Sequence, residues 1–339
     1  MTESHVKPVD RPSNDGGSGE AANGISMSVV ICAYTEKRWV DLFDSLDSLT
    51  QQTVNPHEVI LVIDHNERLL RRCRESFADR GVRVLPNRQQ QGLSGARNTG
   101  LGIASGDVVA FLDDDATADP NWVERLSSHY QQSSVLGVGG FAKPVWPAQT
   151  PTWLPDEFLW VVGCSYTGQP TTVAEVRNFL GCNMSFRRSI FDSVDGFVHG
   201  LGRVGAVPMG CEETELCIRV RSQFPAAAGA LQLVYEPRAL VNHRVSVDRV
   251  RFAYFRSRCF AEGLSKASVT QRVGTDAGLA TERRYVKIVL PKAVAFGVLR
   301  APRDPWGLVR AINVVVGLAW TTAGYATGKW RARSARSRR

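Results

Sequence analysis

Short apolar segments alternate with amphipathic ones between residues 27 and 113, and this alternation constrains the fold more than any other feature. Four segments are apolar runs of strand length, typical of buried strands: MSVVICAY (27–34), EVILVID (58–64), VRVLP (82–86) and DVVAFLD (107–113). Three segments between them have apolar residues at helical spacing: WVDLFDSLDSL (39–49), RLLRRCRESFADR (68–80) and SGARNTGLGIA (94–104), the last capped by Ser94. The alternation predicts an α/β fold, a mainly parallel sheet with helices on both faces.

Three adjacent carboxylates, Asp113, Asp114 and Asp115, follow the fourth strand directly. Carboxylates packed so closely repel one another unless a cation or raised pKa values relieve them. Because side chains alternate along an extended chain, we expect Asp113 and Asp115 to face the same way. Together they suit Mg²⁺ or Mn²⁺, which takes its other ligands from water and substrate phosphates. A helix cap or a solvated turn is the alternative.

Other polar residues stand where a parallel sheet binds its ligands, beyond the carboxyl ends of the strands. Asp64 ends the second strand, where an acid accepts hydrogen bonds from a base or a ribose. Arg97 lies in the first turn of a helix and suits a diphosphate or a sugar. Each also has an ordinary alternative, a loop acid for Asp64 and a structural surface arginine for Arg97.

Glu212 and Glu213 begin the segment EETELCIRVRSQF (212–224), whose apolar spacing predicts a helix. Acids at a helix start are favoured by the helix dipole without any catalytic role. A carboxylate that faces a cleft also serves as a general base.

The C-terminal part is apolar and then strongly basic. Six positive charges and no acid lie in residues 329–339, so most of the formal net charge of +8 belongs to this tail, and no nucleic-acid partner is expected. Residues 311–328 contain no charge, a length at the short end for crossing a bilayer. We expect the apolar segment 285–328 to form an interfacial or partly inserted helix pair, held by the tail on anionic lipid. Two ordinary helices packed on the domain are the alternative.

The cysteines and the N-terminus indicate a cytoplasmic protein. The seven cysteines form no CxxC pair, and residues 1–26 lack the apolar core of a signal peptide. Residues 14–24 are rich in glycine and small residues, so we expect residues 1–26 to be a disordered leader.

Seven motifs occur in an order that resembles family 2 glycosyltransferases, which are inverting enzymes with a GT-A fold: VVICAYTEKR, VIDHN, GLSGARNTGL, VAFLDDDA, FLGCNMSFRRSIFDSVDGF, GCEETELCIRV and YEPRALVNH. The resemblance covers about residues 27–245. It implies a Rossmann-like sheet in a nucleotide-sugar half (27–130) and an α+β acceptor half (131–245). A helical extension (246–284), the apolar segment (285–328) and the basic tail (329–339) follow outside the resemblance.

The resemblance also implies roles on the donor side. The base and ribose would contact a set from the first two strand ends, namely Ala33, Tyr34, Glu36 and Asp64. Arg97 and Asp114 would lie near the donor. Asp113 and Asp115 match the metal-binding DxD pair, and His243 matches a histidine that approaches the metal or the diphosphate.

On the acceptor side, the resemblance implies that Gly181 and Asn183 line the acceptor site. The aromatic faces of Trp153 and of its neighbours Trp146 and Trp160, in a proline- and tryptophan-rich loop, are candidates for stacking on a sugar or a lipid-linked acceptor, with burial in the core as the alternative. The Glu-Asp pair of the family falls on Glu212 and Glu213, which makes Glu213 the expected base. Here glutamate replaces aspartate, so Glu212 is a second catalytic candidate.

We therefore expect a metal-dependent inverting transferase that moves a sugar from a nucleoside diphosphate donor to a hydroxyl acceptor, either a cell-envelope glycan or a lipid-linked precursor. The basic, apolar C-terminus indicates a cytoplasmic enzyme that works peripherally at the inner face of the cell membrane. Two alternatives stay open. One is a nucleotidyltransferase, although no glycine-rich phosphate loop follows the first strand, and the other is a non-catalytic binding scaffold.

Overall fold

The computed structural model describes residues 24–203, 209–226 and 229–336. The expected disordered leader therefore lies, up to residue 23, outside the described residues. Within the described part, nine strands form one mixed sheet in the order β3-β2-β1-β4-β8-β6-β9-β5, with β7 paired to β9.

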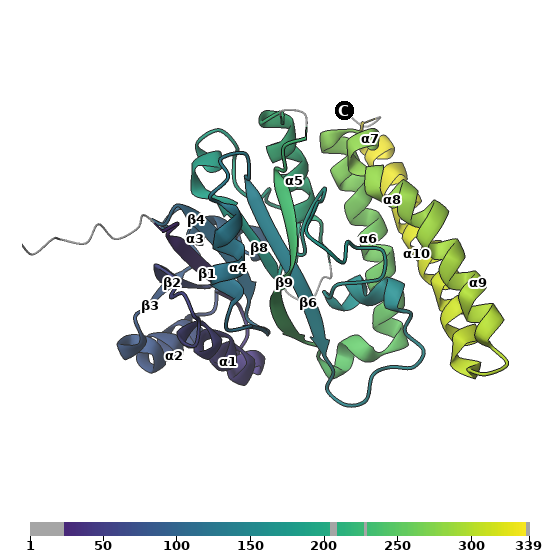
Figure 1. Cartoon of the computed structure of the whole chain (residues 1–339), viewed down its shortest axis with the longest axis horizontal. Coiled ribbons are helices and arrows are strands. Elements are labelled where there is room, and N and C mark those ends of the chain that lie inside the picture. The colour runs from purple at the N-terminus through teal and green to yellow at the C-terminus, as the bar shows by residue number, and fades with distance from the viewer. Residues whose placement is uncertain (1–23, 204–208, 227–228, 337–339) are drawn as a thin grey trace, which may run out of the picture.

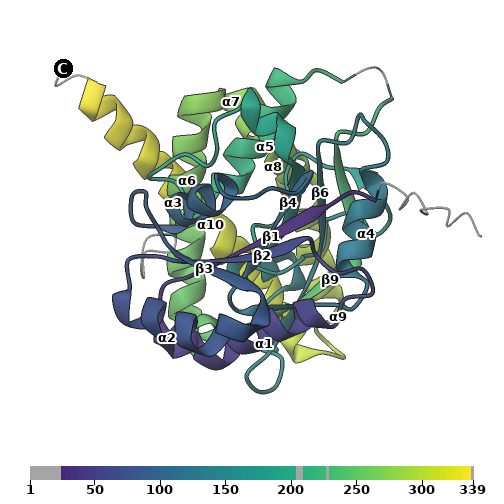
Figure 2. The same cartoon turned by 90° about the vertical axis from the view of Figure 1, so that its left-hand side faces the viewer.

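The first half is the expected parallel α/β unit. Its strands are β1 Met27–Ala33, β2 Glu58–Ile63, β3 Val82–Pro86 and β4 Val108–Asp113, all mutually parallel where they pair. Its helices are α1 Trp39–Thr50, α2 Glu67–Phe77 and α3 Leu93–Leu101. Val29 and Ile31 of β1 pack with α1 and α2, whereas Val30 between them packs with α3. Figure 2 shows these helices on opposite faces of the sheet, as predicted.

One local prediction was wrong, since Ser94 does not cap α3. The helix begins after Gly92, whose φ of +125° is open to glycine but strained for other residues. Ser94 lies inside the first turn, and its hydroxyl donates to the Leu201 carbonyl oxygen at 2.8 Å.

The second half extends the sheet with antiparallel and parallel pairs. Its strands are β5 Ala116–Ala118, β6 Gly137–Val145, β7 Ala174–Glu175, β8 Asn183–Arg187 and β9 Leu233–Arg244. Strand β8 runs antiparallel to β4 and β6, while β6 and β9 are parallel. The helices α4 Trp122–His129 and α5 Glu212–Gln223 belong to this half. Strand β9 closes back onto β5, directly after the acidic triplet.

The C-terminal part is helical and lies beside the sheet (Figure 1). It consists of α6 Phe252–Val273, α7 Thr275–Gly278, α8 Ala280–Arg284, a π-helical turn Tyr285–Val289, α9 Leu290–Arg300 and α10 Pro305–Arg336. Helix α10 runs along α6 and α9. The backbones of α6 and α10 cross so closely that a Cβ on Gly324 would lie 2.0 Å from the Phe260 carbonyl oxygen. Glycine at this position permits the close crossing.

Candidate active site

A cleft opens at the carboxyl ends of β1 and β4. Tyr34 and Asp64 line one part of it, and Glu213 and Tyr254 line another. Residues from both halves of the sheet and from α6 therefore face one space. This is the position in which a parallel sheet binds its ligands.

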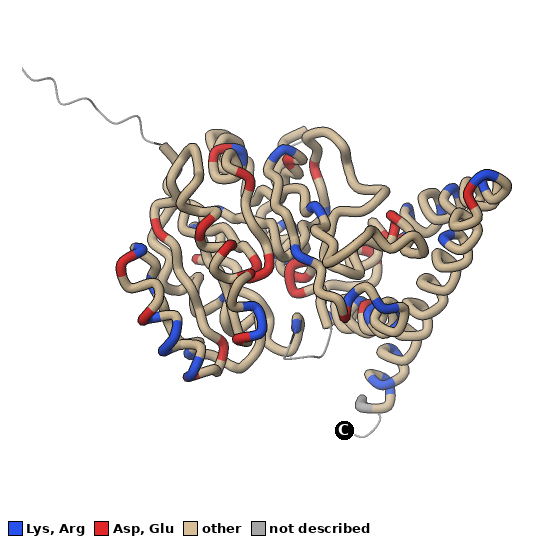
Figure 3. The backbone as a smooth tube through the Cα atoms, turned by 90° about the horizontal axis from the view of Figure 1, so that it is seen from below, with Lys and Arg blue, Asp and Glu red and all other residues tan. Residues whose placement is uncertain are grey.

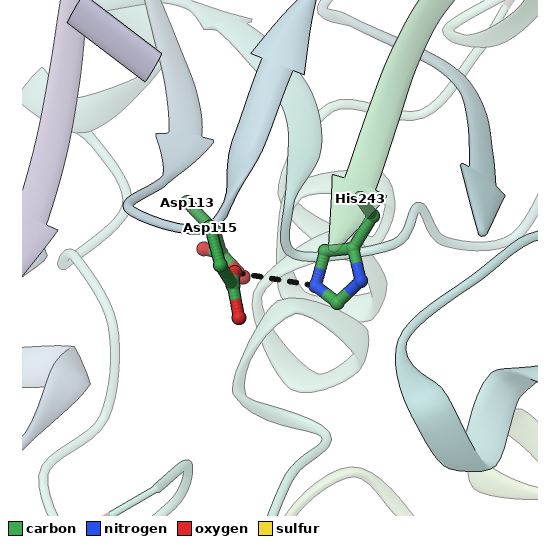
Figure 4. Close-up of side chains that lie close together, drawn as sticks. All are labelled: Asp113, Asp115 and His243. Carbon is green, nitrogen blue, oxygen red and sulfur yellow. Dashed lines mark ion pairs between the residues drawn. The ribbon is translucent and has the colours of Figure 1, made fainter. Parts of the chain in front are cut away.

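Asp113 and His243 line this cleft, and Asp115 lies beside them. Each offers one ligand atom, and these three atoms lie within 4.8 Å of one another. Asp113 ends β4 and Asp115 precedes β5, whose Ala116 is paired with His243 of β9. The strand pairing brings the His243 Nε2 atom to 3.3 Å from Asp115 Oδ1 (Figure 4).

The charges around Asp115 keep it ionised. Its carboxylate is buried, and burial alone would raise its pKa, but the charges of His243, Arg38 and Arg249 hold the pKa of Asp115 well below its usual range. Burial would lower the pKa of His243, whereas the charge of Asp115 raises that pKa to about 10. Without a cation, the two residues form a buried ion pair.

The same residues fit a divalent cation. The buried Oδ1 of Asp115 has no hydrogen-bond partner among the described residues, although His243 is its ion-pair partner. Two carboxylate oxygens and one imidazole nitrogen form a donor set suitable for a divalent cation such as Mn²⁺. Because His243 must lose its proton to become a ligand, cation binding would release that proton.

Asp114 also lines the cleft and binds Arg38, which contacts Asp115 as well. The Arg38 Nη1 atom donates to Asp114 Oδ1 at 2.6 Å and lies 3.1 Å from Asp115 Oδ2. Burial raises the pKa of Asp114 to about 7 despite the charge of Arg38. Asp114 therefore positions an arginine that lines the cleft. Sequence reasoning missed Arg38 as a site residue, although it stands in the quoted motif VVICAYTEKR.

Arg97 connects Asp113, one of the proposed metal ligands, with the pair of glutamates at the start of α5. It is 2% exposed, and its guanidinium donates to Glu212 Oε1 at 2.9 Å and to Asp113 Oδ1 at 3.2 Å. It also donates to the carbonyl oxygen of Gly181 at 2.8 Å. A Cβ on residue 181 would lie 3.0 Å from its Nη2 atom, so glycine leaves the room that this arginine needs. The predicted surface alternative for Arg97 is wrong.

Glu212 and Glu213 begin α5 and face different surroundings. Both line the cleft, but Glu212 is buried against Arg97, while Glu213 accepts a hydrogen bond from the Thr214 hydroxyl at 3.3 Å. Burial, and then the charge of Glu212, raise the pKa of Glu213 to about 8. A carboxyl group with a pKa in this range is suited to proton transfer near neutral pH.

On the nucleotide side, Asp64, Tyr34 and Ala33 line the cleft. The Asp64 carboxylate accepts hydrogen bonds from the Asn87 side chain at 2.7 Å and from the Gly92 backbone at 3.0 Å. Glu36 is not among the described residues that line the cleft. Its carboxylate lies 3.2 Å from Arg68 Nε.

Two acceptor-side predictions are not supported by the geometry. The Asn183 amide is fully buried, receives a hydrogen bond from Trp122 Nε1 and donates to two backbone carbonyl oxygens. No polar atom of that side chain is left for an acceptor. Trp153 is not part of the described lining and packs edge-on against Phe252 and Phe255. Trp160, from the same loop region, lines the cleft instead.

Comparison with known proteins gives consistent similarities. Residues 28–195 match the family described as Glycosyl transferase family 2. The chain is 36% identical over 244 residues to the glucosyl-dolichyl phosphate glucuronosyltransferase of Haloferax volcanii, which covers 71% of this chain and 76% of that protein.

Two solved structures have a similar fold. A mannosyltransferase from Pyrobaculum calidifontis in complex with GDP-Man and Mn²⁺ has a TM-score of 0.55 at 15% identity, over 91% of this chain and 88% of that one. GalNAc-T7 with UDP, GalNAc and Mn²⁺ has a TM-score of 0.52 at 18% identity, over 78% of this chain and 54% of that one. At these identities the likeness concerns the fold alone.

Proposed function

The chain belongs to glycosyl transferase family 2 and is a glycosyltransferase with a GT-A-like fold, and from this premise we propose that it transfers a sugar from a nucleoside diphosphate to a hydroxyl of a lipid-linked acceptor, with inversion and with a divalent cation. Family membership sets aside the nucleotidyltransferase and scaffold alternatives.

The observation that carries the proposal is the position of Arg97. Its guanidinium bridges Asp113, a proposed metal ligand, and Glu212, the neighbour of the expected base. The metal-binding part and the proton-accepting part of the site are therefore joined by one buried arginine. A donor diphosphate held near Asp113 and an acceptor hydroxyl near Glu213 would then lie on the two sides of a transferred sugar. Single displacement with inversion requires this arrangement.

Asp113, Asp115 and His243 would hold Mn²⁺ or Mg²⁺. The bound cation would neutralise charge on the diphosphate leaving group. The buried Oδ1 of Asp115 supports this assignment, because its ion-pair partner among the described residues is His243, itself a proposed ligand. The two structural neighbours carry Mn²⁺ in their complexes, which agrees with it.

The chain's own side chains would do the remaining work. Glu213 would take the proton from the acceptor hydroxyl, and Glu212 would keep Arg97 in place. Arg38 and Arg97 would add positive charge beside the diphosphate. Asp64, with Tyr34 and Ala33, would orient the base and the ribose.

The acceptor and the location follow from two further observations. The relative from Haloferax volcanii is named for a glucosyl-dolichyl phosphate substrate, which supports a lipid-linked acceptor here. Among the described residues, one helix (Pro305–Ser334) is long and apolar enough to cross a membrane, with a mean hydropathy of 1.3 and 33% of that window buried. Several large apolar side chains of α9 and α10 are exposed, namely Phe296, Leu299, Trp306, Ile312 and Val315.

These helices also carry positive charge. Figure 3 shows basic residues at the turn between α9 and α10 and again toward the C-terminal end of α10. The proposed location is therefore the inner face of the cell membrane, where α9 and α10 rest on anionic lipid. Because α10 also packs along α6, an interfacial position agrees better with its contacts than a full span does.

The test uses the full chain and a panel of nucleotide sugars without acceptor. We expect slow release of nucleoside diphosphate that requires Mn²⁺ or Mg²⁺ and stops when the cation is chelated. Release of nucleoside monophosphate, or release that persists after chelation, would contradict the proposal. A ligand that stabilises the folded chain against heat identifies the donor by mass action.

A further inference from the structure

Three arginines line the cleft near the start of α6: one from the residues before α5, one from the turn before α6 and one from α6 itself. Arg203, Arg249 and Arg258 all line the cleft, as does Tyr254. Arg203 Nη2 donates to the Tyr254 hydroxyl at 3.3 Å. Burial would raise the pKa of Tyr254, but the charges of Arg249, Arg203 and Arg258 lower it. The phenol is therefore surrounded by guanidinium groups.

This group carries more positive than negative charge. Arg249 lies 3.6 Å from Asp115, which it shares with Arg38 and His243. Arg258 pairs with Glu262 at 2.8 Å. Arg203 forms no ion pair with any residue that the structure describes. An arginine that faces a cleft without a carboxylate is available for an anionic ligand.

Of these arginines, Arg258 lies on the side of the expected base. A Cβ on Gly210 would lie 2.9 Å from Arg258 Nη2, so Arg258 rests against the chain just before Glu212 and Glu213. The Arg258 guanidinium also lies 5.7 Å from the centre of the Trp160 ring. An anion bound here would be close to the acceptor hydroxyl that Glu213 deprotonates.

The arginines also adjoin the apolar C-terminal helices. Tyr254 and Arg258 belong to α6, and α6 packs along α10, which exposes apolar side chains. An amphiphile bound with its head group in the cleft would have an apolar surface nearby for its chain. A ligand with one phosphate and one hydrocarbon chain matches both features.

We propose that Arg203, Arg258 and Tyr254 bind the phosphate of a lipid-linked acceptor and so position the acceptor sugar for Glu213. This inference rests on the proposed function, which it deepens by naming the group that the acceptor site recognises. The planar guanidinium fork of arginine binds phosphate oxygens in pairs, and the tyrosine hydroxyl donates a third hydrogen bond. These three are positioning residues, since none takes part in proton transfer.

The same arginines could contact a different anion, the carboxylate of an acidic donor sugar. Both ligands offer oxygen anions, so the experiment must separate them. The probes are geranyl phosphate and geraniol for the acceptor, and methyl glucuronide for a donor carboxylate. Binding to the full chain is measured by calorimetry in the presence of saturating UDP or GDP with Mn²⁺, which fills the donor site.

The wild-type chain is expected to bind geranyl phosphate at least about tenfold more tightly than geraniol. Arg203→Gln should weaken binding of geranyl phosphate about tenfold and leave the affinity for geraniol unchanged. Tyr254→Phe, which keeps the ring and removes the hydroxyl, should weaken binding of geranyl phosphate by a smaller factor. The matched control is Arg74→Gln, an exposed arginine in the last turn of α2, and it should have no effect. Thermal unfolding verifies that each variant is folded.

Three results would overturn the proposal: no loss of geranyl phosphate binding in Arg203→Gln, displacement of geranyl phosphate by nucleoside diphosphate with Mn²⁺, or a selective loss of methyl glucuronide binding. Because probe binding needs no turnover, it is independent of the metal-dependent release assay. Arg203-dependent binding in a chain that hydrolyses no nucleotide sugar would count against the proposed function and leave the phosphate site standing.

Discussion

Arg97 shows why single residues of the site are difficult to separate. It is nearly fully buried and neutralises parts of two acids, Asp113 and Glu212. Removing one partner of a buried ion pair leaves an uncompensated charge, which costs about 3–5 kcal/mol. Substitutions at Arg97 would therefore combine effects on folding and on catalysis. The more informative substitutions are at Asp115 and Glu213.

Asp115→Asn is expected to abolish the cation-dependent part of nucleoside diphosphate binding, because one of the two carboxylates at the site loses its charge. The measurement is calorimetric titration with UDP or GDP in the presence and absence of Mn²⁺. Asp248→Asn is the control, since that side chain is 82% exposed on the turn before α6. An affinity of Asp115→Asn that equals the wild-type affinity in the presence of Mn²⁺ would contradict the ligand assignment.

Glu213→Gln is expected to leave donor binding intact and to lower turnover at least about a hundredfold, the usual contribution of a general base. The amide has nearly the same shape but cannot accept the proton. Single-turnover transfer measures this, with Glu124→Gln on the exposed face of α4 as the control. Near-normal turnover would move the role to Glu212.

The pH dependence of kcat/KM tests the same residue. The base must be unprotonated to act, and the pKa of Glu213 in the free enzyme is raised to about 8. The activity should therefore rise with pH through about 8 and level off above it, because kcat/KM reports the free enzyme. A rise of kcat/KM near pH 4 instead of near pH 8 would mean that Glu213 is not the titrating group.

At the scale of elements, the close crossing of α6 and α10 fixes the C-terminal helices to the catalytic domain. Gly263 and Gly324 meet there with almost no space between the backbones. A buried chain of ion pairs joins the same region to the site. Glu262 of α6 pairs with Arg258, which lines the cleft, and with Lys266.

Gly324→Leu is expected to lower the free energy of unfolding by about 1–3 kcal/mol or more, because its Cβ would collide with the Phe260 carbonyl oxygen and force the helices apart. Thermal unfolding measures the loss. Ala323→Leu, one residue earlier on an exposed position of α10, should change the melting temperature little. Equal behaviour of the two variants would show that the crossing is looser than the structure has it.

At the scale of the whole molecule, α9 and α10 lie on the side away from α1 and α2 (Figure 1), and several of their large apolar side chains are exposed. The double variant Leu299→Asp with Ile312→Asp should weaken binding to vesicles that contain anionic lipid at least about tenfold, since two exposed apolar groups that would enter the lipid become charged. Vesicle sedimentation measures it. Val54→Asp, an exposed apolar residue after α1, is the control. Unchanged sedimentation of the double variant would refute the proposal that α9 and α10 contact the membrane.

The sequence by itself determined the parallel α/β half and the positions of its acids. Strand length, helical spacing and the carboxylates at strand ends are local patterns, and a parallel sheet places those ends along one edge. The same reasoning placed Glu212 and Glu213 at a helix start, which is where α5 begins. The resemblance to a known family added the order of the motifs and the GT-A fold, which the comparisons confirm.

Only the tertiary structure decided which side chains meet. The pairing of β5 with β9 puts His243 beside Asp115, and the turn after β4 gives Asp114 to Arg38. Core packing uses the amide of Asn183 and holds Trp153 against Phe255, outside the described lining of the cleft. These outcomes depend on contacts between segments far apart in the chain, and on which polar groups remain unsatisfied after packing. A local pattern carries neither kind of information, because both arise only when the whole chain is folded.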